Sequence, residues 1–183
     1  MLKLILISGK AGNGKTTAAN MIKEILETAG NKVVVTRYAY YLKDLAKRYC
    51  NWDGNKDDYG RTLLQTLGTD IIREKLNKKN FHVSRICEDI EICQDYVDYV
   101  IIDDVRFENE VYYPKALFGN KVLTIRIDRL DEDGSTYKSP LSEKQKNHIS
   151  ETALDNFYFD KTLHPRSKRD LKNQIEKYIL PIL

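Results

Sequence analysis

The chain has 183 residues, of which 42% are hydrophobic and 31% charged, and its formal net charge is +3. This length and composition predict a single globular domain, residues 1–183, that buries its own core. The three cysteines are odd in number and lack metal-ligand spacing, which indicates reduced thiols in a cytoplasmic protein. So small a charge gives no argument for a nucleic-acid polymer as partner, and no apolar run is long enough to cross a membrane. A small anionic molecule suits this charge equally well, and a homodimer stays open.

The first part of the chain alternates strand-like and helical patterns. The apolar run at residues 2–7 predicts a buried strand, residues 15–28 predict an amphipathic helix that ends at Gly30, and "KVVVTR" (32–37) predicts a second strand. Helical periodicity then continues up to the third strand, over residues 41–49, 61–76 and 81–94. We interpret residues 38–95 as a helical insertion that binds a substrate.

The second part adds three more strands and a polar connection. Continuous apolar runs predict buried strands at "DYVIID" (98–103) and "KVLTIRI" (121–127), and "FDKTL" (159–163) predicts a fifth strand before a closing helix at 167–179. Residues 129–150 are polar and predict a mobile lid. The fold class expected is therefore α/β, a doubly wound five-stranded parallel sheet with a helical insertion and a lid.

The stretch "SGKAGNGKTT" (8–17) follows the first strand and opens the first helix. It matches G-x-x-x-x-G-K-[ST] in the context that this motif requires. Its backbone N–H groups can surround phosphate oxygens, while Lys15 reaches the outer phosphates and Thr16 offers its hydroxyl to magnesium. The motif predicts a bound nucleoside triphosphate. The residues expected to bind it are Gly9, Lys10, Ala11, Gly12, Asn13, Gly14, Lys15, Thr16 and Thr17.

Two patterns bear on what happens to the triphosphate. "NKDD" (55–58) matches the guanine-reading N-K-x-D, but it precedes the third strand and the D-x-x-G of "DEDG" (131–134), so we interpret it as accidental. Asp103 and Asp104 end a buried strand, where a magnesium-binding acid belongs, but Val105 follows where a hydrolysing ATPase usually has glutamate. Hydrolysis as the main activity is therefore disfavoured.

Transfer of a phosphoryl group to a second phosphate requires cations rather than a general base, because the attacking oxygen is already anionic. Arginine suits this role through its planar, bidentate geometry. Arginines fall at strand ends, in the insertion and before the lid: Arg37, Arg61, Arg73, Arg106, Arg126 and Arg129.

At this point the sequence resembles a family. "WDGNKDDYGRTLLQTLGTD", "IIDDVRFENE" and "HISETALDN", together with "LKDLAK" and "RIDR", resemble the deoxynucleoside monophosphate kinases of bacteriophages, within the P-loop nucleoside monophosphate kinase superfamily. The likeness runs from about residue 2 to residue 163. A weaker likeness, in "DDVR" and "SETALDN", is to the animal type of phosphomevalonate kinase. The resemblance implies ATP as donor, Mg²⁺ as cofactor and a deoxynucleoside 5′-monophosphate as acceptor.

The resemblance also implies roles for individual residues. The catalytic group would be Lys15, Asp104, Arg106 and Arg129, the last as the lid arginine. Magnesium would be held by Thr16 and Asp104, with Asp103 as a less certain second acid. The acceptor would be bound by Arg37, Lys43, Arg61, Gln65, Arg73, Arg106, Ser150 and Glu151. Within this set Gln65 is a candidate for the base, while Ser150 and Glu151 have the alternative of a helix N-cap and a first-turn acid.

The chain departs from the family at Tyr41, where proline is usual, at His82, where tryptophan is common, and in "LHPRSK" (163–168). Base selectivity stays open for this reason. Two other functions also stay open: a kinase of another phosphorylated metabolite, and a P-loop ATPase that works on a protein partner.

Overall fold

The structure is a computed structural model that describes residues 2–55, 57–139 and 141–183. Lys56, in the N-K-x-D-like loop, and Pro140, in the expected lid, lie outside the described residues. Among the residues described, no helix combines the length and apolar character that a membrane span needs.

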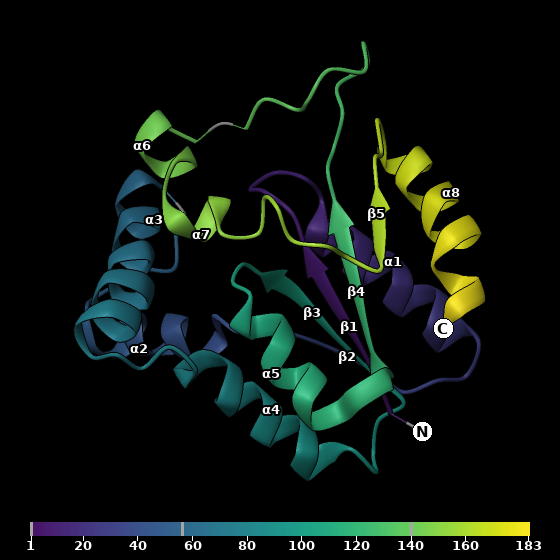
Figure 1. Cartoon of the computed structure of the whole chain (residues 1–183), viewed down its shortest axis with the longest axis horizontal. Helices are drawn as coiled ribbons and strands as arrows, with labels where there is room; N and C mark the ends of the chain where they lie inside the picture. The colour runs from purple at the N-terminus through teal and green to yellow at the C-terminus, as the bar shows by residue number, and fades with distance from the viewer. Residues whose placement is uncertain (1, 56, 140) are drawn as a thin grey trace.

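Five parallel strands form one sheet in the order β2-β3-β1-β4-β5 (Figure 1). Their bounds are Lys3–Ser8 (β1), Val33–Thr36 (β2), Tyr99–Val105 (β3), Val122–Ile127 (β4) and Lys161–Leu163 (β5). The predicted five-stranded parallel sheet is confirmed. In register, Ser8 lies beside both Val105 and Arg126. The segments that follow β1, β3 and β4 therefore meet at one edge of the sheet, where ligands of open α/β sheets bind.

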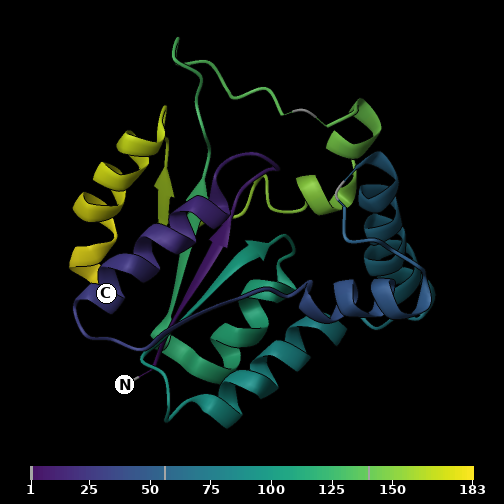
Figure 2. The same cartoon turned by 180° about the vertical axis from the view of Figure 1, so that it is seen from behind.

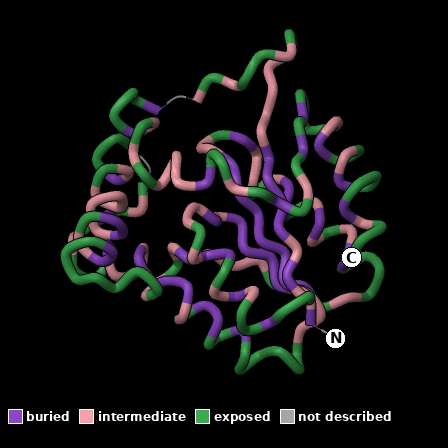
Figure 3. The backbone as a smooth tube through the Cα atoms, viewed as in Figure 1, coloured by how far each residue is buried: buried purple, intermediate pink, exposed green. Residues whose placement is uncertain are grey.

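Helices cover both faces of the sheet, because the strands are apolar on both sides. Leu4 and Leu6 of β1 belong to the core under α4 (Phe81–Cys93) and α5 (Asn109–Phe118). Ile5 and Ile7 point the other way, into the core under two further helices. Those helices are α1 (Lys15–Thr28) and α8 (Lys168–Tyr178), seen in front in Figure 2. The buried strands run through the centre of Figure 3.

The helical insertion stands beside the sheet and differs from the prediction in one place. It begins with α2 (Tyr40–Tyr49), and the helix expected over 61–76 is two elements, α3 (Asp58–Gln65) and the π-helix η1 (Thr66–Lys75). The Asp57 side chain accepts a hydrogen bond from Gly60 N and starts α3 earlier than periodicity indicated. A π-helix is rare and occurs often at functional sites, and the apolar spacing alone does not distinguish it from an α-helix.

The polar connection after β4 contains short helices that periodicity did not reveal. It leaves the sheet as an extended arm bridged at Leu130 and Thr136, and returns through α6 (Glu143–Lys146) and α7 (Ile149–Thr152) (Figure 1). His148, not Ser150, caps α7, so the N-cap interpretation of Ser150 is wrong. Short 3₁₀ turns lie between α5 and β4, η2 (Gly119–Lys121), and after α8, η3 (Leu180–Ile182).

Candidate active site

The phosphate loop joins β1 to α1 and is held against β4. Gly9 has a φ of 146°, and a Cβ there would lie 2.4 Å from the carbonyl oxygen of Ile127, so only glycine fits. Asn13 donates a hydrogen bond to that same carbonyl, at 3.0 Å. These contacts with the neighbouring strand fix the shape of the loop.

Lys15 lies folded back on this loop. Its ammonium donates to the carbonyl oxygens of Gly9, at 2.7 Å, and Lys10, at 3.0 Å. Burial, together with the nearby Arg106 guanidinium, lowers the pKa of Lys15 to about 7. An anion bound at the loop would restore the charged form, so this lysine is poised to respond to a phosphate.

Of the two acids at the end of β3, Asp103 is the one that contacts Thr16 at the end of the phosphate loop. The Thr16 hydroxyl donates to Asp103 Oδ2 at 2.5 Å, and Arg37 donates to both carboxylate oxygens, at 2.6 and 2.9 Å. Burial opposes ionisation, but the hydrogen bonds from Arg37 and Thr16 hold the pKa of Asp103 below its usual value. Arg37, expected from the sequence to bind the acceptor, thus pairs with Asp103 beside the phosphate loop and lies outside the walls of the cavity between the insertion and the end of β3.

Asp104 points to the other face of the same strand. Its carboxylate accepts hydrogen bonds from the backbone N–H groups of Tyr38, at 2.8 Å, and Ala39, at 3.1 Å, just before α2 begins. Desolvation raises its pKa in spite of these bonds. The hydrogen bond to Thr16 is therefore made by Asp103, although the family resemblance ranked Asp104 first for magnesium.

One hydroxyl and one carboxylate are a suitable protein contribution for Mg²⁺. This ion prefers oxygen ligands and usually takes only one or two carboxylates, the rest being water and substrate phosphates. Thr16 and Asp103 offer such a pair beside the loop. Within residues 2–55, 57–139 and 141–183 no group of three or more His, Cys, Asp or Glu side chains is placed to hold a metal ion.

A cavity of about 210 Å³, which we call the central cavity, opens between the insertion and the ends of β3 and α7. Its walls include apolar side chains such as Leu42, Leu64 and Phe107. The structure also gathers there most residues expected to bind an acceptor: Lys43, Arg61, Gln65, Arg73, Arg106, Ser150 and Glu151, together with Asp104. These residues come from five separate segments, so their meeting is a tertiary result.

Arg106 and Glu151 connect the central cavity to the phosphate loop. The Arg106 guanidinium forms an ion pair with the Glu151 carboxylate and donates to the Ser150 carbonyl at 3.1 Å. The other Glu151 oxygen accepts a hydrogen bond from the backbone N–H of Ala11, at 3.0 Å. A carboxylate from α7 thus occupies an N–H group of the loop that a phosphate oxygen could also use.

A buried ion pair supports the backbone around Arg106. Arg73 and Glu110 pair with side-chain exposures of 6% and 5%, and Glu110 also accepts from the N–H groups of Arg106, at 2.7 Å, and Phe107, at 3.1 Å. Burial raises the pKa of Glu110 to about 7, against the pull of Arg73. Arg73 therefore positions Arg106 indirectly. Nothing in the local sequence around Glu110 indicates this distant partner.

The arm after β4 lies over the phosphate loop. The Arg129 guanidinium is 4.2 Å from the centre of the Tyr137 ring, a cation–π contact. The same ring lies against Gly12, where a Cβ would come within 2.8 Å of it. Arg126, at the end of β4, pairs instead with Asp128 and Asp155. Arg129 is therefore linked to the phosphate loop through the Tyr137 ring.

Comparison with known proteins gives only a general likeness. No protein-family model and no curated protein sequence matches the chain. A mutant of the APS kinase of Mycobacterium tuberculosis is similar with 13% identity and a TM-score of 0.48, over 96% of this chain and 94% of that one. The shikimate kinase of Aquifex aeolicus gives 13% identity and a TM-score of 0.48, over 98% and 97%. These values assign the chain to no family.

Proposed function

We propose that the chain is a phosphotransferase that moves the terminal phosphoryl group of MgATP to a deoxynucleoside 5′-monophosphate. The observation that carries this proposal is the junction between phosphate loop and central cavity, made by Arg106, Glu151 and Ala11. Two anionic molecules bound on either side of this junction would meet there, with a cation between them. Such placement and charge neutralisation account for most of the catalysis of phosphoryl transfer.

The described carboxylates that line the central cavity are already paired, which favours a phosphate over a hydroxyl as acceptor. A hydroxyl would need a base within reach. Among the described lining residues, Asp104 is held by two backbone N–H groups, Glu110 by Arg73, and Glu151 by Arg106. A phosphate needs no base, and the cationic side chains Lys43, Arg61 and Arg106 suit it. This supports a nucleotide or another phosphorylated molecule as acceptor.

The residues of the donor side would act as follows. Residues 9–17 would hold the ATP phosphates through backbone N–H groups, and Lys15 would leave its carbonyl partners to contact the outer phosphates. Thr16 and Asp103 would hold magnesium, with Asp104 as the family's alternative; when bound, the ion would neutralise charge on the phosphates. Arg37 would keep Asp103 ionised through its two hydrogen bonds.

The residues of the acceptor side would act around Arg106. Arg106 would contact the acceptor phosphate once Glu151 releases it, and Arg129 would move from Tyr137 onto the transferring group as the arm, residues 129–150, closes as a lid. Lys43, Arg61 and Gln65 would hold the rest of the nucleotide. Closure of the lid would exclude water, which would otherwise waste ATP by hydrolysis.

The test is ADP production from MgATP with dTMP, dGMP, dCMP, dAMP and their ribonucleotides, and with Lys15→Ala as blank. Turnover that requires one or a few deoxynucleotides would support the proposal and name the substrate. Turnover that appears only with a different phosphorylated metabolite would favour the rival kinase. An equally slow rate with every acceptor and with none would refute acceptor phosphorylation and favour an ATPase with a protein partner.

A further inference from the structure

His82, at the start of α4, is a buried polar side chain without a partner. It is 4% exposed, and neither of its ring nitrogens has a hydrogen bond with any described residue. Nearly all buried polar groups in native proteins are paired, because an unpaired one loses its hydration without compensation. The packing of α4 therefore gives no reason for histidine at this position.

The ring of His82 belongs to the wall of the central cavity. It lies against Gly68 of η1, where an added Cβ would come 3.9 Å from His82 Nε2. A side chain at Gly68 would meet Leu42 at 2.9 Å, so glycine lets η1 pack closely against Leu42 and the imidazole. The ring also packs edge-on against Phe81, with centroids 5.3 Å apart. The imidazole is thus held in place and borders the cavity.

The histidine is uncharged under ordinary conditions. Burial, together with the Arg73 guanidinium, lowers the pKa of His82 to about 4. The Gly68 backbone acts in the opposite direction and raises the pKa of His82, although its contact with the ring lacks the geometry of a hydrogen bond. A neutral imidazole offers one N–H donor and one nitrogen acceptor, which suits an uncharged polar ligand group better than a phosphate.

The central cavity thus has two chemically different parts. Near the phosphate loop it presents the Arg106 guanidinium, which can bind an anion once Glu151 releases it. Beside η1 and α4 it presents the neutral polar groups of Gln65, Thr69 and His82 among apolar walls. A molecule with a phosphate at one end and a flat, polar, uncharged ring at the other matches both parts.

We propose that His82 reads the base of the acceptor nucleotide through a direct hydrogen bond, and so determines which base is accepted. This inference rests on the proposed function and deepens it. From the sequence, Gln65 is a candidate for hydrogen bonding to the base. The base would supply the missing partner of the imidazole. An acceptor without a matching group would leave that nitrogen buried and unpaired, and would be rejected.

The experiment measures kcat/KM for the eight nucleoside monophosphates with the wild-type protein, His82→Phe and His82→Gln. Phenylalanine keeps a flat ring without polar atoms, and glutamine keeps a donor and an acceptor. His164→Phe, at an exposed histidine outside the cavity walls, is the matched control.

In His82→Phe we expect the preferred base to lose about 10- to 100-fold in kcat/KM, while poorly used bases change about twofold or less. The loss should fall mainly on KM, because the base lies away from the transferring phosphoryl group. His82→Gln should recover part of the loss, and His164→Phe should behave as wild type. An equal loss for all bases, or unchanged selectivity, would overturn the role of His82 while leaving the kinase proposal intact.

A second measurement separates this inference from the proposed function. If the wild-type protein forms no ADP with any nucleotide, the kinase proposal fails. Calorimetric titration of the monophosphates into wild type and His82→Phe then decides the inference alone. Base-selective binding that is lost in His82→Phe supports it, and no binding, or binding equal in both proteins, overturns it. Thermal unfolding of the free proteins is the control for folding: His82→Phe should unfold at the same or a higher temperature, since it removes an unpaired buried group.

Discussion

If ATP binds at the phosphate loop as proposed, Glu151 competes with it, and Glu151→Gln should therefore bind ATP more tightly than the wild type. In the free protein the carboxylate holds the N–H of Ala11 and the guanidinium of Arg106, with its side chain only 7% exposed. A phosphate oxygen needs the same N–H group and cannot share it with a second anion. The glutamine keeps the shape of the side chain but removes its charge.

The magnitude follows from the bonds that are weakened. Hydrogen bonds to a charged group contribute about 1.5–3 kcal/mol and neutral ones about 0.5–1.5 kcal/mol. Replacing the carboxylate should therefore lower the cost of opening this contact by about 1–1.5 kcal/mol. Since about 1.4 kcal/mol corresponds to a factor of ten in affinity, the Kd for ATP should fall roughly 5- to 10-fold.

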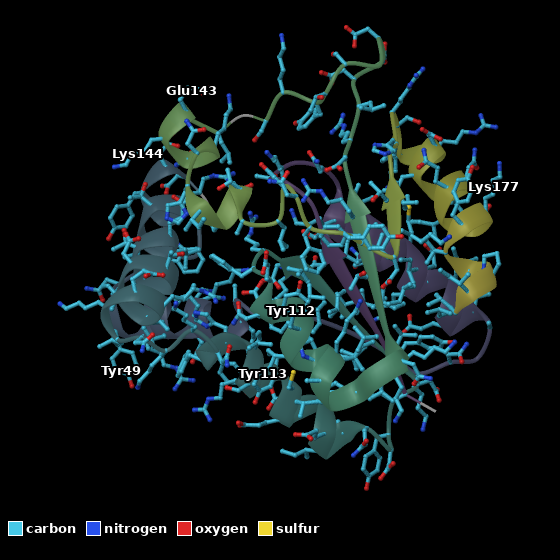
Figure 4. All side chains as sticks on the ribbon, in the orientation of Figure 1. Tyr49, Tyr112, Tyr113, Glu143, Lys144 and Lys177 are labelled. Carbon is cyan, nitrogen blue, oxygen red and sulfur yellow. The ribbon has the colours of Figure 1, made fainter. Side chains whose placement is uncertain are left out.

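The assay is calorimetric titration of ATP into wild type, Glu151→Gln and Glu143→Gln. Glu143 lies on α6 in the arm, at the outer surface in Figure 4, with its side chain 80% exposed and paired to Lys146. It controls for loss of one negative charge from the arm. Unchanged or weaker ATP binding in Glu151→Gln, or an equal gain in Glu143→Gln, would refute a direct competition at Ala11.

Three further predictions concern buried titratable groups. Arg73→Ala should lower the free energy of unfolding, measured in urea titrations, by about 3–5 kcal/mol, because it leaves the Glu110 carboxylate buried without its partner. The double variant Arg73→Met/Glu110→Leu should recover much of this loss. A small effect of Arg73→Ala alone would contradict the buried ion pair. For His82 the folded pKa is about 4 and the ordinary value 6.5, so the unfolded chain binds more protons between these values. The free energy of unfolding of the protein should therefore fall by about 3 kcal/mol as the pH drops from 6.5 to 4. If the stability of His82→Phe depended on pH in the same way as that of the wild type, this prediction would be wrong. Lys15 has a pKa of about 7, so above pH 7 its amine must take up a proton before it can bind the ATP phosphates as a cation. ATP affinity should hence decrease up to about tenfold per pH unit above 7, and Lys15→Arg should flatten the profile.

Much of the fold could be predicted because its signals are local. Continuous apolar runs identified the strands, and α1 occupies the residues that periodicity indicated, Lys15–Thr28. The phosphate loop could also be predicted, since its glycines, Lys15 and Thr16 stand at fixed spacing between a strand and a helix. The π-helical turn of η1 and the short helices of the arm were not, because few residues define them and their apolar spacing is ambiguous.

The functions of the charged residues depended on tertiary contacts. Asp103 and Asp104 are neighbours on one strand, and successive side chains of a strand point to opposite faces. The sequence identified both acids, but only the packing of α1 on one face and the start of α2 on the other directs Asp103 to Thr16 and Asp104 to backbone N–H groups. The two arginines Arg106 and Arg73 likewise differ only in their tertiary partners. Arg106 reaches the phosphate loop through Glu151, whereas Arg73 is buried against Glu110. Local sequence specifies which chemical groups are present and on which element; their partners come from segments far apart in the chain, and those meet only when the sheet order brings the strand ends to one edge.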